Sequence, residues 1–178
     1  MRQIKFLIFL VVFISHSTGD GVFKVDKNRI NYSFQFSCNL PADSLLHILY
    51  SFHHLKNYSS QFTAINLILE GESFYDVEFQ VKYLFYASKA LYRRTLFKDS
   101  GLIKIEMMKF EQNSTIFPRL IKSATEYRVL QEKGKNVEVI CLQTNLLSKP
   151  LNWIYLRVIH KKMDEFMLEL HDYIKGFE

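Results

Sequence analysis

The spacing of apolar residues changes along the chain, and each change predicts a different kind of element. Between residues 30 and 38 apolar and polar residues alternate strictly, which is typical of a strand with one buried face. The next apolar residues recur at three- and four-residue steps, so they predict a helix of about three turns. These residues are Leu45, Ile48, Leu49, Phe52 and Leu55. Pro41 and Asp43 suit the start of this helix.

Alternation with a period of two resumes at Phe62. It is strictest where Tyr75, Phe79 and Tyr83 point to one face and charged residues point to the other. Turn residues divide the whole stretch into several strands, and a hairpin turn is predicted at residues 132–135. The predicted strands cover residues 62–70, 75–85, 91–97, 102–110, 123–131 and 136–144.

A long helix over residues 151–177 is predicted to close the chain, with Ser148 as its N-cap. Its apolar residues form one stripe, and a stripe of that length must be buried against something. The only large surface available is the sheet, and a helix laid across a curved antiparallel sheet leaves a space for a ligand or a core. The stripe consists of Leu151, Tyr155, Val158, Phe166, Leu170, Ile174 and Phe177.

Residues 1–19 have the layout of a secretory signal peptide. Arg2 and Lys5 precede an apolar run over residues 6–14, which is too short to cross a bilayer as an anchor. Small residues follow, so we expect cleavage before Asp20 and export to the periplasm or the cell exterior. An uncleaved anchor helix is the alternative. Residues 20–178 are then enough for one domain.

Composition and charge narrow the possible partners. The formal net charge is +5, it is spread along the chain, and Arg2 and Lys5 would leave with the signal peptide, so no nucleic acid partner is expected. With 16 Phe and 10 Tyr the chain can fill a core or line a roomy apolar pocket. Cys38 and Cys141 either form a disulfide or are two separately buried thiols.

Few residues carry recognisable chemistry. His53 and His54 are neighbours on a helix and point in different directions, so no metal site is expected. No catalytic motif is present, so we predict no catalytic residue and no cofactor. Arg93 and Arg94 are adjacent in a strand, and an inward arginine would need an anionic partner such as a ligand carboxylate or phosphate. If the alternation breaks there, both reach solvent.

The order of elements resembles the START-like superfamily (SRPBCC), the helix-grip proteins that include birch-pollen-allergen relatives and the polyketide cyclase/dehydrase group. Residues 34–43 resemble the strand and the Pro/Ala start of the first helix, and residues 46–58 resemble a helix that ends at a short aromatic stretch. Residues 152–174 resemble the closing helix. Residues 56–60 lack the proline corner that often precedes the second strand in such proteins.

The resemblance implies an α+β helix-grip fold, in which a seven-stranded antiparallel sheet curves around the C-terminal helix and encloses a cavity. The implied partner is a lipid or another hydrophobic small molecule, with transient contact with a membrane. An enzyme of the cyclase or dehydratase kind and an interaction module with a filled core are the alternatives. The candidate ligand-binding residues are Phe34, Phe36, Tyr75, Phe79, Tyr83, Arg93, Tyr127 and Tyr155.

Overall fold

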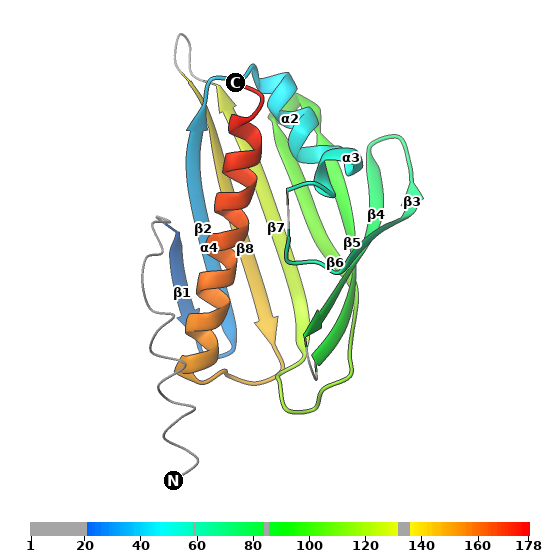
Figure 1. The fold of residues 1–178 in the computed structure, drawn as a ribbon, viewed down its shortest axis with the longest axis vertical. Helices are drawn as coiled ribbons and strands as arrows, with labels where there is room; N and C mark the ends of the chain where they lie inside the picture. The colour runs from blue at the N-terminus through cyan, green and yellow to red at the C-terminus, as the bar shows by residue number, and fades with distance from the viewer. Residues whose placement is uncertain (1–20, 59, 84–85, 132–135) are drawn as a thin grey trace.

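The computed structural model of the chain shows one curved antiparallel sheet, with helices packed on its inner side (Figure 1). The predicted signal peptide and the predicted turn at 132–135 lie outside the residues that it describes. The described residues are 21–58, 60–83, 86–131 and 136–178.

The sheet has eight strands in the order β1-β2-β8-β7-β6-β5-β4-β3. Successive strands from β3 to β8 pair as hairpins, and β2 pairs with β8, so the first half of the chain is joined to the last strand. The strands are β1 Val22–Asp26, β2 Arg29–Cys38, β3 Ala64–Glu70, β4 Phe74–Tyr83, β5 Tyr86–Phe97, β6 Leu102–Gln112, β7 Leu120–Gln131 and β8 Val137–Leu147.

The predicted fold class is confirmed, with one strand more than the seven predicted. The additional strand is β1, which pairs with β2 at the edge of the sheet. Four of its five residues are exposed, so it lacks the alternation that marks a half-buried strand. Its turn into β2 contains Lys27 at a φ of 53°, a left-handed conformation that a lysine rarely adopts.

The first predicted helix is two helices in the structure, α2 (Ala42–Tyr50) and α3 (Phe52–Leu55). They are separated at Ser51, whose backbone is extended at φ −59° and ψ 131°. The Ser51 side chain accepts a hydrogen bond from the backbone N–H of His53, so it caps α3 as serine commonly does. The three-to-four-residue spacing continues across this break, and for that reason the pattern predicts a single helix.

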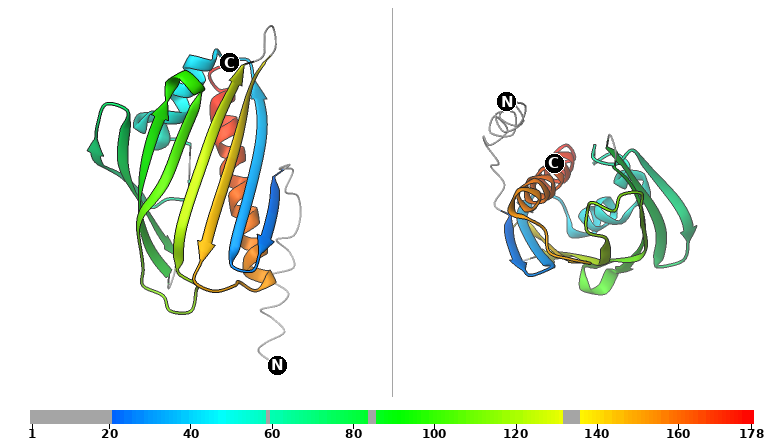
Figure 2. Two further views of the ribbon diagram at one scale, coloured as in Figure 1. Left: turned by 180° about the vertical axis from the view of Figure 1, so that it is seen from behind. Right: turned by 90° about the horizontal axis from the view of Figure 1, so that it is seen from below.

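The closing helix α4 spans Trp153–Lys175 and lies over the β2 side of the curved sheet (Figure 2). The predicted cap was wrong: Asn152 accepts a hydrogen bond from the backbone N–H of Tyr155 at 3.0 Å and caps α4. Ser148 instead accepts one from the backbone N–H of Arg119.

One buried carboxylate ties α4 to the sheet. The Tyr32 hydroxyl on β2 donates to Asp164 on α4 at 2.8 Å, and both residues are buried. His160 lies one helical turn before Asp164, 3.3 Å from its second oxygen, and stacks on Phe23 with ring centroids 4.6 Å apart. These contacts fix one long side of α4 against β1 and β2.

A second connection runs from the segment between α3 and β3 to α4. Ser60 donates from its backbone N–H and from its hydroxyl to Glu169, and the Gln61 side chain donates to the Lys162 carbonyl at 2.8 Å. The interior therefore has the sheet on one side, α2 and α3 at one end and α4 along its β2 side. Within the described ranges, no helix combines the length and the apolar character needed to cross a bilayer.

Candidate functional site

Five of the eight predicted residues lie in the core on the inner side of the sheet. They come from three strands, β2, β4 and β7, and are all buried; they are Phe34, Phe36, Tyr75, Phe79 and Tyr127. Tyr83 ends β4, and its side chain lies outside the described part of the structure. Tyr155 lies in the first turn of α4, is exposed, and contacts Phe117 with ring centroids 5.1 Å apart.

Arg93 does not point inward as predicted. The alternation is kept at this point of β5, so Arg93 faces the outer side and Arg94 the inner side. Arg93 donates two hydrogen bonds to Asp76, at 2.8 and 2.9 Å, and its guanidinium lies 4.4 Å from the Phe74 ring centroid. The inward arginine is thus Arg94, which is 2% exposed.

Arg94 contacts the C-terminal end of α2. Its Nη2 donates to the carbonyl of Leu49, and the Tyr75 hydroxyl donates to the next carbonyl, that of Tyr50, at 2.6 Å. The last carbonyls of a helix have no partner within it and carry the negative end of its dipole, so a cation is favourable there. Side chains from β4 and β5 therefore stabilise the break at Ser51.

Two buried donors beside this contact have no partner. Among the described residues, neither Arg94 Nε nor the Tyr58 hydroxyl has a hydrogen-bond acceptor, and both side chains are buried. The side chains that act most strongly on Arg94 are the tyrosines Tyr58, Tyr75 and Tyr127. We call Arg94, these three tyrosines and Cys141 the arginine–tyrosine cluster; the Cys141 thiol interacts with Tyr127.

Every member of the arginine–tyrosine cluster stays protonated at neutral pH. Burial raises the pKa of Tyr58, Tyr75 and Tyr127, and it raises the pKa of Cys141 to about 12. Burial alone lowers the pKa of Arg94, but the neighbouring tyrosines outweigh it and the pKa lies above its ordinary value. The cluster is therefore one permanent cation among neutral hydroxyl and thiol groups.

Next to this cluster the inner face is less completely covered. Tyr92, Thr125 and Gln143 lie on the inner side of three different strands, and each is only half-buried. Phe166 and Met163 of α4, which pack against the core from above, are half-buried as well. The inner face beneath the middle of α4 is consequently more exposed than the region around Arg94.

Aromatic rings line this half-covered region. Phe62 and Phe79 have ring centroids 4.5 Å apart, Phe79 and Tyr92 5.7 Å, and Phe62 and Phe166 6.3 Å. The rings belong to β4, β5, α4 and the segment before β3, so they form a continuous apolar wall from the sheet to the helix. Such a wall offers a large apolar contact area.

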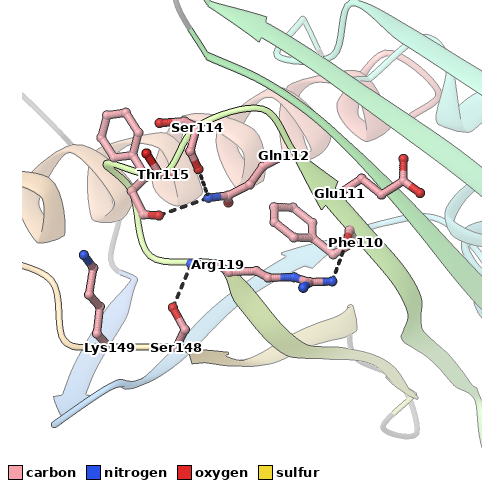
Figure 3. Close-up of a pocket in the computed structure, with 9 residues that line it drawn as sticks. Phe110, Glu111, Gln112, Ser114, Thr115, Arg119, Ser148 and Lys149 are labelled. Atoms are coloured by element: carbon pink, nitrogen blue, oxygen red, sulfur yellow. Dashed lines mark hydrogen bonds between the residues drawn. The ribbon is translucent and has the colours of Figure 1, made fainter.

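Two open pockets lie at opposite ends of the molecule, and none of the eight predicted residues lines either one. The first, of about 560 Å³, lies between the end of β6, the loop after it and the segment before α4 (Figure 3). Its polar groups bond mainly to one another: Gln112 donates to Ser114 and Phe117 carbonyls, and Arg119 to the Phe110 carbonyl.

The second pocket, of about 520 Å³, lies between α2, α3 and the C-terminus. His47 and His54 line it with ring centroids 5.5 Å apart, and His54 Nδ1 lies 2.9 Å from the Tyr173 hydroxyl. Burial and the neighbouring His47 and His53 lower the pKa of His54. The described residues contain no group of three His, Cys, Asp or Glu side chains that could hold a metal ion.

The two cysteines are separate. Cys38 and Cys141 lie on the neighbouring strands β2 and β8, but Cys141 is paired with Phe34 and Cys38 with Val137. Both thiols are free and buried. Of the two readings of the sequence, separately buried thiols match the structure.

Comparison with known proteins identifies solved structures that have a similar fold. No protein-family model matches the chain, and no curated protein sequence matches it either. Solved structures do match. A STAR-related lipid transfer protein from Xanthomonas axonopodis has a TM-score of 0.67 at 9% identity, covering 90% of this chain and 96% of its own. The Zhui aromatase/cyclase from Streptomyces sp. R1128 has a TM-score of 0.65 at 12% identity, covering 84% and 96%.

A plant protein shares the same architecture. Ginseng major latex-like protein 151 from Panax ginseng has a TM-score of 0.58 at 13% identity, covering 84% of this chain and 97% of its own. Together with the curved sheet and the closing helix, these likenesses show that the chain has the START-like, helix-grip fold. The predicted resemblance is confirmed at the level of the fold.

Proposed function

We propose that this protein is a START-like domain that binds a hydrophobic ligand between the sheet and α4. The class of ligand that we propose is a lipid. The observation that carries the proposal is the half-buried, aromatic inner face beneath the middle of α4, bounded by Phe79, Tyr92 and Phe166. A site of this kind, apolar and with a few polar groups at one end, is typical of small-molecule binding. The likeness to a lipid transfer protein supports the same class of ligand.

Binding is better supported than catalysis. A cyclase or dehydratase needs a group that accepts a proton, and the arginine–tyrosine cluster contains only groups that stay protonated. The structural similarity to an aromatase/cyclase concerns the fold and does not identify a catalytic base in this chain. A plain interaction module is disfavoured because Thr125 and Gln143 would be buried in a completely filled interior.

We also propose that the domain acts outside the cytosol and exchanges its ligand at a membrane surface. The apolar run at residues 6–14 supports export. Exposed apolar side chains at one end of the domain support membrane contact: Ile116 is 75% and Trp153 63% exposed. Arg157 lies 5.0 Å from the Trp153 ring, a combination of cation and aromatic ring that suits an interface with lipid headgroups.

Native mass spectrometry of the purified domain, followed by solvent extraction, tests the proposal. We expect a bound hydrophobic molecule or, after delipidation, uptake of a fluorescent fatty acid. Thr125→Trp fills the space beneath α4 and should abolish uptake, whereas Arg128→Trp places the same ring on the outer face of β7 and should not. A protein that carries nothing and takes up no probe would overturn the proposal.

A further inference from the structure

We propose that the polar end of the ligand is an anion, a carboxylate or a phosphate, and that Arg94 binds it at the α2 end of the interior. This inference rests on the proposed function, because it specifies the ligand of the same site. Arg94 is a buried cation, and the arginine–tyrosine cluster contains no anionic side chain.

The groups around the buried Arg94 guanidinium are neutral. A guanidinium cannot lose its proton in a protein, and burying it without a partner of opposite charge is costly. It donates to the neutral carbonyl of Leu49, and its strongest neighbours are the neutral tyrosines Tyr58, Tyr75 and Tyr127. An anionic group brought in by a ligand would balance the charge.

The neighbouring Arg93 provides an internal comparison. Its guanidinium, on the outer side of β5, donates two hydrogen bonds to Asp76. The chain therefore supplies a carboxylate to the outer arginine, where it is needed least, and a helix carbonyl to the inner one. Capping of α2 uses Nη2 of the inner guanidinium and leaves its Nε without an acceptor among the described residues.

The arginine–tyrosine cluster also contains two buried donors that lack an acceptor among the described residues. Arg94 and Tyr58 interact with each other, but within the described ranges neither Arg94 Nε nor the Tyr58 hydroxyl has an acceptor at hydrogen-bond geometry, and both are buried. Tyr58 lies beneath α4, with its ring 6.0 Å from that of Phe166 and 5.9 Å from that of Tyr173. Tyr58 is thus on the side of the interior next to α4 and interacts with Arg94, and a carboxylate or phosphate can accept from a guanidinium and a hydroxyl together.

The apolar wall continues from this point. Tyr92 is on the same face of β5 as Arg94, two residues nearer the start of the strand, and it contacts Phe79. A ligand whose anionic end is at Arg94 would lay its hydrocarbon chain along Tyr92 and Phe79, toward the less buried middle of the interior. The polar and apolar halves of the site are therefore in the order that an amphipathic molecule needs.

Matched ligands test the inference on the unmodified protein. Palmitate, hexadecyl phosphate and hexadecanol have the same chain length and differ in their polar ends. In competition with a fluorescent fatty acid, at least one anion should bind about 30-fold or more tightly than the neutral alcohol, the range expected for a desolvated charge pair. Which of the two anions binds more tightly distinguishes a carboxylate ligand from a phosphate ligand.

Two substitutions locate the effect. Arg94→Met should reduce the preference for the anion to less than about threefold while leaving hexadecanol binding nearly unchanged. Arg93→Met, which removes a charge from the outer face, should keep the full preference. If none of the three ligands binds the wild-type protein, the proposed function fails. If all three bind it equally, the function stands and the role of Arg94 is overturned, whether or not the Arg94 variant folds.

Discussion

The two halves of α4 share one sequence pattern but not one environment. In the C-terminal half, Met167, Leu170 and Ile174 are buried in the core. In the N-terminal half, Trp153 is 63% and Val158 50% exposed, although Val158 belongs to the same predicted stripe. Periodicity shows which residues share a face of a helix, but the elements packed on that face decide whether it is buried.

The comparison extends to the interior that α4 covers. Near its C-terminal half, α2 and α3 close the end of the sheet and the arginine–tyrosine cluster is buried. Toward its N-terminal half, inner-face residues such as Thr125 and Gln143 are half-buried. The half of the domain near α2 and α3 thus has a buried core that contains the charged Arg94. The other half has an inner surface that is only partly buried.

The largest effect should come from truncating the buried half of the helix. Leu170→Ala removes a completely buried side chain and should lower the free energy of unfolding by about 2–5 kcal/mol. Val158→Ala, on the exposed half, should change it by less than about 0.5 kcal/mol. Urea unfolding of both variants measures the difference. Equal losses would show that the two halves are packed alike.

A smaller loss is expected from a buried hydroxyl. Tyr75→Phe leaves the Tyr50 carbonyl at the end of α2 without its donor and should cost about 1–2 kcal/mol in unfolding free energy. Tyr155→Phe makes the same chemical change in the exposed half and should be close to neutral. A neutral Tyr75 variant would mean that Arg94 alone stabilises the break between α2 and α3.

Acid should weaken the closed end of the domain. The pKa of His54 in the folded state lies below its ordinary value, because of burial and the neighbouring His47 and His53, so the unfolded chain binds the proton more readily. The stability contributed by neutral His54 is present above the ordinary pKa of about 6.5 and is lost as pH falls through it toward the folded value.

His54→Gln should therefore flatten the fall in melting temperature between neutral pH and about pH 5, and glutamine retains a group that can bond to the Tyr173 hydroxyl. Some pH dependence should persist, because burial also lowers the pKa of His171. A variant with the same slope as the wild type would contradict this account of the His54 environment.

The smallest effect on stability should come from the exposed apolar end. Trp153→Ala and Ile116→Ala should each alter the unfolding free energy by less than about 0.5 kcal/mol. They should nonetheless weaken sedimentation of the protein with vesicles that contain anionic lipid, since these side chains supply the apolar contact. Unchanged vesicle binding would contradict the proposal that this end of the domain contacts the membrane.

The sequence was sufficient for the fold where residues alternate along a strand or repeat along a helix. It predicted β2 to β8 in order, and all of these strands except the largely exposed β3 have one buried face. It missed β1, which is stabilised by pairing rather than by burial, and the break at Ser51. That break depends on Arg94 and Tyr75, which are far from α2 in the sequence.

The candidate site was predicted in part. The aromatic residues on the inner face follow from alternation, but the choice between Arg93 and Arg94 depends on the register of β5, which the sequence leaves open by one residue. Once that register is known the choice follows, because Arg94 pairs with Tyr75, a residue that alternation places on the inner face. Tyr58 was missed because it lies outside any periodic segment.

Photo-crosslinking with a fatty acid that carries a diazirine near the end of its chain tests most directly whether the ligand binds between the sheet and α4. After irradiation and proteolysis, the account predicts labelled peptides from the inner wall, in particular those that contain Phe79, Tyr92 or Phe166. Unlabelled palmitate should suppress the labelling. Labelling confined to the exposed end around Ile116 and Trp153 would contradict an internal site.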